Sequence, residues 1–180
     1  TAPLSVDLDL ALQRKQSQFQ AGIFALNKLT DGNVHITYSE DTVSDTMLET
    51  KGAVHHTIPG PHPAGNIGIQ IHHIAPLNLK DIVWTLNAQD VVRIGTFFLT
   101  GELDVSNIIT VVGPSIKKPA HYISRIGNEM TSIVHDNLQD ENFRLISGDV
   151  LTGNTSSLEG HSNFYDTTIT VIPENDEREF

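Results

Sequence analysis

The sequence has 180 residues, and its 11 Lys and Arg against 22 Asp and Glu give a formal net charge of −11 with the nine histidines neutral. This acidic balance argues against nucleic acid and anionic lipid as partners, because both are bound through clustered Lys and Arg. The chain has no cysteine, which excludes disulfides, thiolate nucleophiles, cysteine-held iron–sulfur clusters and cysteine zinc sites. No apolar run approaches the roughly 20 residues that a membrane helix needs. With 38% hydrophobic residues, the chain is expected to form one or two small domains.

The part up to about residue 102 alternates between helical and strand-like patterns. In chain order these predict a helix over 8–26 that starts near Asp7 or Asp9, a strand over 34–38, a helix over 42–50, strands over 53–58 and 82–86, and a helix that Asn87 caps and Gly101 ends. Residues 63–74 fit either a strand, through alternating isoleucines, or a helix. Such alternation is typical of a parallel sheet with helices on its faces.

Several apolar residues in this part are predicted to face a core. The short helix over 42–50 directs Val43, Met47 and Leu48 inward. The helix after Asn87 has an apolar face made of Val91, Val92, Ile94, Phe97 and Phe98. The run 82–86 is predicted to be a buried strand, with Trp84 packed in the sheet core or lining a pocket.

The pattern then changes to short strands around one helix. Strands are predicted over 108–112, 122–123, 143–151 and 167–172, and a helix over 127–138 with Met130, Ile133, Val134 and Leu138 on its inward face. This order predicts a small α+β unit with a domain boundary near 102–106. The charged residues 174–179 are expected to form a frayed end. Because it lacks an initiator Met and ends abruptly, the sequence is expected to be a piece trimmed from a longer protein.

Motifs of the common nucleotide-binding and hydrolytic sites are missing. The glycine-rich stretch 60–68 lacks the Lys and Ser/Thr of a Walker A loop, because Asn66 and Ile67 follow Gly65. The sequence has no G-x-G-x-x-G, no G-x-S-x-G nucleophile elbow and no H-E-x-x-H metal motif. Ser147 to Asp149 are interpreted as a turn after a strand. A hydrolase is therefore not favoured.

Histidines concentrate in one part of the chain. Five of the nine are His55, His56, His62, His72 and His73. Three interpretations are open. Converging imidazoles can hold a transition metal, although adjacent histidines on a strand or helix point in different directions. Histidines at a helix C-terminus stabilise its partial negative charge. A neutral histidine can also donate a hydrogen bond to the carbonyl oxygen of a quinone.

Five segments carry a family resemblance. They are His62-Pro-Ala-Gly65, Asp81–Gly95, Thr100-Gly-Glu-Leu103, Ile146–Gly153 and Glu177-Arg-Glu-Phe180. In this order they resemble the A subunit of the sodium-translocating NADH:ubiquinone oxidoreductase, which is itself similar to the flavin-binding subunit of respiratory complex I and to the C subunit of Rnf-type complexes. The resemblance implies a Rossmann-like α/β domain over 1–103 and a β-grasp (soluble ligand-binding) domain over 104–180 with a C-terminal strand. It also favours a helix after Gly65.

The resemblance has chemical implications. The iron–sulfur cysteines of the complex I and Rnf relatives have no counterpart, which selects the A subunit, and the flavin-cradling glycine loop of complex I falls upstream of Thr1 or is absent. This implies a non-redox scaffold and docking fragment of a peripheral subunit on the cytoplasmic side of the bacterial inner membrane. Its expected partners are the other subunits, which carry the flavins, the iron–sulfur centres and the sodium path, and ubiquinone.

A quinone site is the functional site that the resemblance implies. The residues expected to form it are His62, Pro63, Gly65, His72, His73, Trp84 and Gln89. The histidines and Gln89 are expected to hydrogen-bond the ring oxygens, and Trp84 to supply apolar surface, at the strand ends where α/β layers often bind ligands. No catalytic or metal-ligating residue is expected. The alternative is a small-ligand or metal-binding α/β plus β-grasp module unrelated to respiration.

Overall fold

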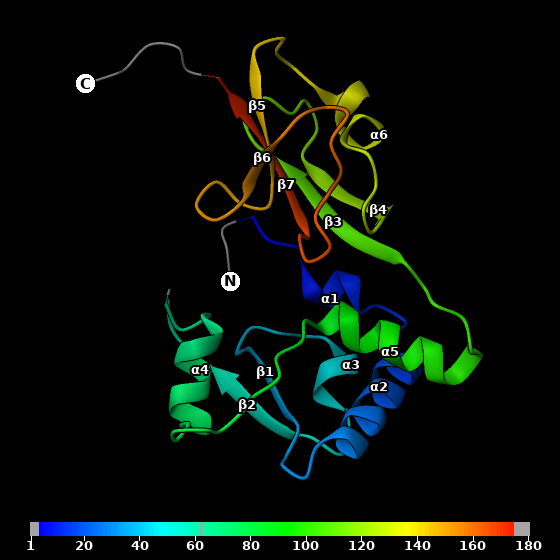
Figure 1. Ribbon diagram of the computed structural model, residues 1–180, viewed down its shortest axis with the longest axis vertical. Coiled ribbons are helices and arrows are strands. Elements are labelled where there is room, and N and C mark those ends of the chain that lie inside the picture. The colour runs from blue at the N-terminus through cyan, green and yellow to red at the C-terminus, as the bar shows by residue number, and fades with distance from the viewer. Residues whose placement is uncertain (1–3, 62, 175–180) are drawn as a thin grey trace. The chain divides into compact units, whose positions relative to one another are not determined.

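The computed structural model describes residues 4–61 and 63–174 (Figure 1). The chain forms two compact units, which are Asp7–Asp104 and residues 105–174 together with residues 4–6. Each unit has a hydrophobic core of its own. Within the described ranges, no helix is both long and apolar enough to cross a membrane.

The first unit combines helices with a two-stranded parallel sheet. Its elements are α1 (Leu8–Ala11), α2 (Gln16–Leu29), β1 (His35–Ser39), α3 (Asp45–Leu48), β2 (Val54–Ile58), α4 (Ile67–Ile74) and α5 (Ala88–Thr100). The mixed α/β character predicted from the sequence is confirmed. The helical alternative for 63–74 is also confirmed, although this helix begins only at Ile67.

The helix predicted over 8–26 is wrong as a single element. Asp7 caps α1 by accepting hydrogen bonds from the backbone N–H groups of Asp9 and Leu10, at 2.9 and 3.3 Å. The chain then turns at Arg14, which has a positive φ of 61°, before α2 begins at Gln16. Because Leu12 at this break is fully buried, the turn lets both short segments contribute apolar side chains to one core.

Helices α2 and α5 cross at two glycines. A Cβ atom on Gly95 would overlap the carbonyl oxygen of Gln18, and one on Gly22 would overlap the carbonyl oxygen of Val91. The two backbones are therefore in direct contact, which only glycine permits at both positions. This crossing holds Phe19, Ile23 and the first half of α5 in the core.

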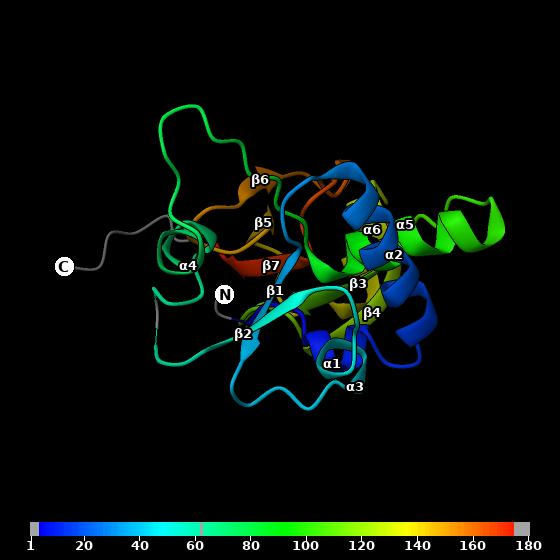
Figure 2. The same cartoon turned by 90° about the horizontal axis from the view of Figure 1, so that it is seen from below.

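The ends of α5 were predicted correctly and its apolar face only in part. The side chain of Asn87 accepts the N–H of Asp90, and Gly101 ends the helix with a φ of 77°. Val91 and Val92 are buried as expected, but Phe97 and Phe98 are exposed. The reason is that α5 extends past α2 beyond the crossing at Gly95, as Figure 2 shows.

The inward face predicted for 42–50 is also wrong in part. The helix α3 is a single turn, in which Thr46 and Met47 are buried. The Thr46 hydroxyl donates to the carbonyl oxygen of Leu12 at 3.1 Å and so fixes this turn against the end of α1. Val43 precedes α3 and is exposed, and Leu48 lies on its outer side.

The buried strand predicted over 82–86 is not present. These residues have no regular secondary structure, and Ile82 and Trp84 are 80% and 88% exposed. The prediction that Trp84 packs in a sheet core is therefore wrong for this structure. In the described part of the chain, the sheet of the first unit consists of β1 and β2, and neither strand pairs with 82–86.

The second unit contains a five-stranded mixed sheet, a short α-helix and a 3₁₀ helix. Its elements are β3 (Ser106–Val112), β4 (Ala120–Arg125), α6 (Met130–Val134), the 3₁₀ helix η1 (His135–Asn137), β5 (Phe143–Ser147), β6 (Asn154–Ser156) and β7 (Thr168–Pro173). The strand order is β4-β3-β7-β5-β6, with β3 and β7 parallel and the other pairs antiparallel. The core joins Met130 and Val134 of α6 to Ile109, Val111, Ile169 and Val171 of the sheet.

Strands are present at all four positions predicted in this unit, although β4 is longer than the predicted 122–123 and β5 is shorter than the predicted 143–151. The strand predicted over 143–151 ends at Ser147, because Gly148 has a φ of 103° and Asp149 holds the turn that follows. The Asp149 carboxylate accepts hydrogen bonds from the Thr152 hydroxyl and the Leu151 N–H, both at 2.7 Å, and these bonds lower the pKa of Asp149. The short polar strand β6 was not predicted, since its residues show no apolar alternation.

We expect Gly95→Ala to lower the free energy of unfolding by about 2–3 kcal/mol, because the added methyl group must separate α2 from α5. The matched control is Gly68→Ala in α4, where nothing lies within 4 Å of an added Cβ. This control should raise stability by about 0.5–1 kcal/mol through helix propensity. Urea denaturation of both variants checks the prediction, and equal midpoints would show that the helices do not touch at Gly95.

Candidate functional site

The two parallel strands of the first unit place alternate residues on two different faces. Thr37 pairs with His56, and Ile36 pairs with His55. Ile36 and Tyr38 face the core formed with α2 and α5. His35, Thr37 and His56 therefore share the opposite face. In Figures 1 and 2, α4 lies on the side of the strand pair away from α2 and α5.

Gln70 of α4 connects this face to the loop before the helix. The Thr37 hydroxyl donates to Gln70 Oε1 at 2.9 Å, and Gln70 Nε2 donates to the carbonyl oxygen of Ala64 at 3.2 Å. The single side chain of Gln70 thus joins β1, α4 and the turn at residues 63–65. These two hydrogen bonds fix α4 and the turn beside the face formed by His35, Thr37 and His56, which is called the histidine face below.

His35 and His56 form a hydrogen-bonded pair on that face. His35 Nδ1 and His56 Nε2 are 2.9 Å apart, and the ring centroids are separated by 5.1 Å. One ring must donate its N–H and the other must accept it, so the pair is not formed when both rings are protonated. Partial burial lowers the pKa of His56 below its ordinary value of 6.5, and the nearby His35 and His55 lower it further.

The outer nitrogens of this pair are available to a ligand. Among the described residues, His35 Nε2 and His56 Nδ1 have no hydrogen-bond partner. In the neutral pair, the ring that accepts the inner bond carries its hydrogen on the outer nitrogen, and the ring that donates has a lone pair there. When both rings are neutral, the pair therefore presents one donor and one acceptor outward.

His55 points to the other face and has a structural environment. Its Nε2 lies 2.8 Å from the carbonyl oxygen of Thr50, and its ring centroid lies 6.0 Å from that of Tyr38. Because a carbonyl oxygen only accepts, Nε2 is the donor of this hydrogen bond, and in the neutral ring Nδ1 is then an acceptor. This Nδ1 is buried and lacks a partner among the described atoms.

The residues expected at a quinone site occupy three parts of the first unit. His62 lies outside the described residues, while Pro63 and Gly65 lie in the turn before α4. His72 and His73 lie in the last turn of α4, exposed, with ring centroids 5.3 Å apart. Pro63 and Gly65 therefore precede the N-terminal end of α4, and His72 and His73 lie at its C-terminal end.

Trp84 and Gln89 lie farther along the chain. Trp84 makes no hydrogen bond or ring contact with any residue that the structure describes. Gln89 lies in the first turn of α5, is half-buried and has a polar partner. Trp84 and Gln89 thus lie on a different segment of the chain from Pro63, Gly65 and the α4 histidines.

Sequence reasoning missed His35, Thr37 and Gln70. The signal that points to them is the alternation of side chains between the two faces of each strand, His35 with Ile36 and His56 with its neighbours. This signal becomes readable only once the two strands are paired in parallel. Among the described residues, no group of three or more His, Cys, Asp or Glu is placed to hold a metal ion.

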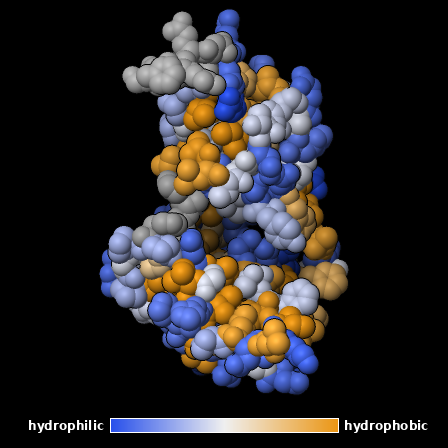
Figure 3. Space-filling view, turned by 60° about the vertical axis from the view of Figure 1, so that its left-hand side comes forward, coloured by the Kyte–Doolittle hydropathy of each residue, from blue (hydrophilic) through white to orange (hydrophobic). Residues whose placement is uncertain are grey.

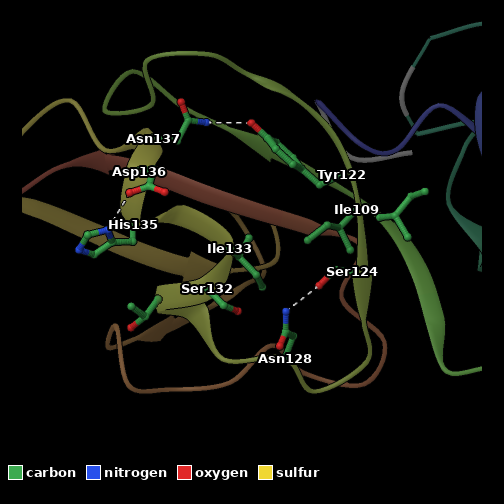
Figure 4. A pocket seen from close by; sticks show the side chains of 11 residues that line it. Ile109, Tyr122, Ser124, Asn128, Ser132, Ile133, His135, Asp136 and Asn137 are labelled. Atoms are coloured by element: carbon green, nitrogen blue, oxygen red, sulfur yellow. Dashed lines mark hydrogen bonds and ion pairs between the residues drawn. The ribbon is translucent and has the colours of Figure 1, made fainter.

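The second unit has an open cleft between β4 and α6 (Figure 4). Its volume is about 540 Å³. Several of its polar groups pair with each other: Asn137 Nδ2 donates to the Tyr122 hydroxyl at 3.2 Å, and Asn128 Nδ2 donates to Ser124 Oγ at 3.3 Å. None of the described residues that are expected at the quinone site lines this cleft. It is therefore a weaker candidate than the histidine face.

Two families match the chain in order. The family described as NqrA second alpha/beta domain matches residues 1–103, and the family described as NQRA C-terminal domain matches residues 108–157. The first match covers more than half of the sequence. The chain belongs to the NqrA family.

Curated relatives agree with this assignment. The A subunit of the Na(+)-translocating NADH-quinone reductase of Rhodopirellula baltica is 36% identical to this NqrA-family chain over 182 residues, which is 100% of the chain and 40% of the relative. The proteins of the same name from Histophilus somni and Yersinia pseudotuberculosis are 35% and 31% identical and cover 100% and 99% of the chain. The chain spans 40% of the length of each of these relatives.

We expect the His35→Ala variant of this NqrA-family chain to raise the pKa of His56, because one of the groups that lower it is removed. Imidazole ¹⁵N NMR titration measures this shift. His161→Ala, in the second unit, is the matched control and should leave the titration of His56 unchanged. A pKa of His56 that does not respond to the loss of His35 would contradict the pairing.

The lowered pKa of His56 also predicts a pH dependence of stability. Below the ordinary value of 6.5, the unfolded chain binds this proton more strongly than the folded chain does. The contribution of His56 is therefore fully present above pH 6.5 and is lost as the pH falls through the folded-state pKa. Unfolding midpoints measured from pH 7.5 downward should fall less steeply for His56→Gln than for the unsubstituted chain.

Proposed function

We propose that these 180 residues are a scaffold and docking part of the A subunit in a sodium-translocating NADH:quinone oxidoreductase. The observation that carries this proposal is the match of both NqrA domain families, in order, and of named relatives across the whole chain. The relatives are named as one subunit of a larger reductase, so the proposed partners are the other subunits. The family matches favour this function over the metal-binding module unrelated to respiration.

We infer that this part of the subunit has no redox centre of its own. The sequence has no cysteine to hold an iron–sulfur cluster, so the flavins, the clusters and the sodium path are assigned to partner subunits. The proposed location is the cytoplasmic side of the bacterial inner membrane, with the subunit held there by protein contacts. The net charge of −11 supports this arrangement, because it disfavours direct binding to anionic lipid.

We further propose a Rossmann-like layer for the first unit and a β-grasp fold for the second. Support for the former is the parallel pair β1–β2 with α2 and α5 on one face and α4 on the other. Support for the latter is the mixed sheet β4-β3-β7-β5-β6 packed against α6.

The proposed ligand is a quinone, ubiquinone in the first instance, bound on the histidine face beside α4. The His35–His56 pair has an outward N–H for a quinone oxygen and an outward lone pair for a quinol hydroxyl. His72, His73, Pro63 and Gly65 lie on α4 and the turn before it, which Gln70 joins to Thr37 of this face, and the exposed Ile67 and Ile69 of α4 supply apolar surface. His62, Trp84 and Gln89 remain proposed members of the site.

The test of the quinone site titrates a short-chain ubiquinone analogue into the full-length protein. Imidazole resonances of His35, His56, His72 and His73 should shift saturably during titration, and a variant with alanine at His72 and His73 should raise the Kd about tenfold. His135→Ala in the second unit is the control and should leave the Kd unchanged. Absence of saturable shifts at all four histidines would refute the site.

Assembly is tested separately from quinone binding. The full-length protein, expressed with its genomic neighbours, should co-purify with proteins that contain flavin and that oxidise NADH with quinone in a sodium-dependent reaction. Recovery of the full-length protein without such partners, with full reductase activity in the fraction that lacks it, would contradict the proposed membership of the complex.

A further inference from the structure

The connection between α4 and α5 leaves an unusual amount of apolar surface exposed. Its exposed apolar side chains are Leu77, Leu79, Ile82, Val83, Trp84 and Leu86. Lys80 and Asp81 are the only residues with a formal charge in the sequence from 52 to 89, although Asp, Glu, Lys and Arg make up 18% of the whole chain. Figure 3 shows apolar side chains gathered on the side of the first unit near α4. Surface of this kind is normally covered by a partner.

Within this connection, residues 82–86 have the composition of a strand without the structure of one. Ile-Val-Trp-Thr-Leu consists of β-branched, aromatic and aliphatic residues that are enriched in strands. In the described part of the chain, the backbone N–H groups of 82–86 form no hydrogen bond. A segment with unpaired backbone groups and apolar side chains is a template for pairing with another strand.

The two-stranded sheet of the first unit also lacks strands. β1 and β2 are parallel, and parallel strands occur almost only in larger sheets that are covered on both faces. Such a sheet is built from strands that alternate with helices along the chain. This alternation is followed by the chain order β1, α3, β2, α4, residues 82–86 and α5. A third parallel strand is expected where residues 82–86 stand.

We propose that residues 82–86 are a strand of a larger parallel sheet whose missing strands come from the part of the same polypeptide outside these 180 residues. The relatives contain the whole of this chain as 40% of their length, so the remaining 60% of such a polypeptide can supply the strands. A segment of the same chain pairs without the loss of translational freedom that a separate partner entails. Two copies related by a two-fold axis would join their sheet edges antiparallel, which does not continue a parallel sheet.

Hydrogen exchange on the full-length protein, purified without its partner subunits, tests this proposal. Amides of 82–86 should exchange at least about a hundredfold more slowly than in the 180-residue chain, as expected when a segment joins a cooperative unit. The amides of Val91 and Val92 in α5 are the internal control and should be protected in both samples. Fast exchange of 82–86 in the full-length protein, or equal protection in both samples, would overturn the proposal.

Two further outcomes would identify a different source of the missing strands. Protection that arises only when the partner subunits are added would assign the strand to an intersubunit sheet and overturn the proposal. Protection that increases with protein concentration would assign it to a second copy and overturn it likewise. Neither outcome depends on quinone binding, so the failure of this inference is distinguishable from the failure of the proposed function.

A proline substitution provides an independent measurement in the full-length protein. Thr85→Pro removes a backbone N–H that is unpaired here and is paired in the proposed strand, so it should lower the unfolding midpoint by several degrees. Thr85→Ala is the matched control and should change the midpoint by less than half as much. Equal midpoints for the two variants would contradict the pairing of this strand.

Discussion

The parallel register of β1 and β2 determines which side chains of the first unit face the core and which remain free for a ligand. With Ile36 and Tyr38 in the core, His35 and Thr37 must face the other way, and the pairing of Thr37 with His56 brings the second histidine beside the first. A slip of one residue in either strand would exchange the two faces of that strand. The same pairing decides the place of α4, because Thr37 is the residue that Gln70 contacts.

The parts of the fold that depend on local chemistry could be predicted from the sequence. Asp7 and Asn87 start helices because their side chains accept backbone N–H groups within three residues, and Gly101 ends α5 because it adopts a positive φ. The parts that depend on distant contacts could not. The exposure of Phe97 and Phe98 follows from the place at which α2 crosses α5, and that place is set by Gly22 and Gly95, residues with no apolar signal of their own.

The candidate site, like the fold, could be predicted from the sequence only in part. A cluster of histidines was visible within 55–73, and the turn before α4 was recognised from its family motif. His35 lies outside that stretch of sequence and joins His56 only through strand pairing. Gln70 has a role because it reaches both Thr37 and Ala64, a bridge that no spacing rule reveals. Trp84 lies in a run with the composition of a strand, but the strand itself requires neighbours that these residues do not supply.

The quinone site and the completed sheet make different demands on Trp84. In a strand over 82–86, pleating places Ile82, Trp84 and Leu86 on one face and Val83 and Thr85 on the other. Trp84 therefore joins the histidine face in only one of the two orientations of that strand. In the other, it enters the core with α2 and α5, where a large aromatic ring gains most from burial. Membership of Trp84 in the quinone site thus requires one orientation of the added strand, whereas the strand itself is compatible with both.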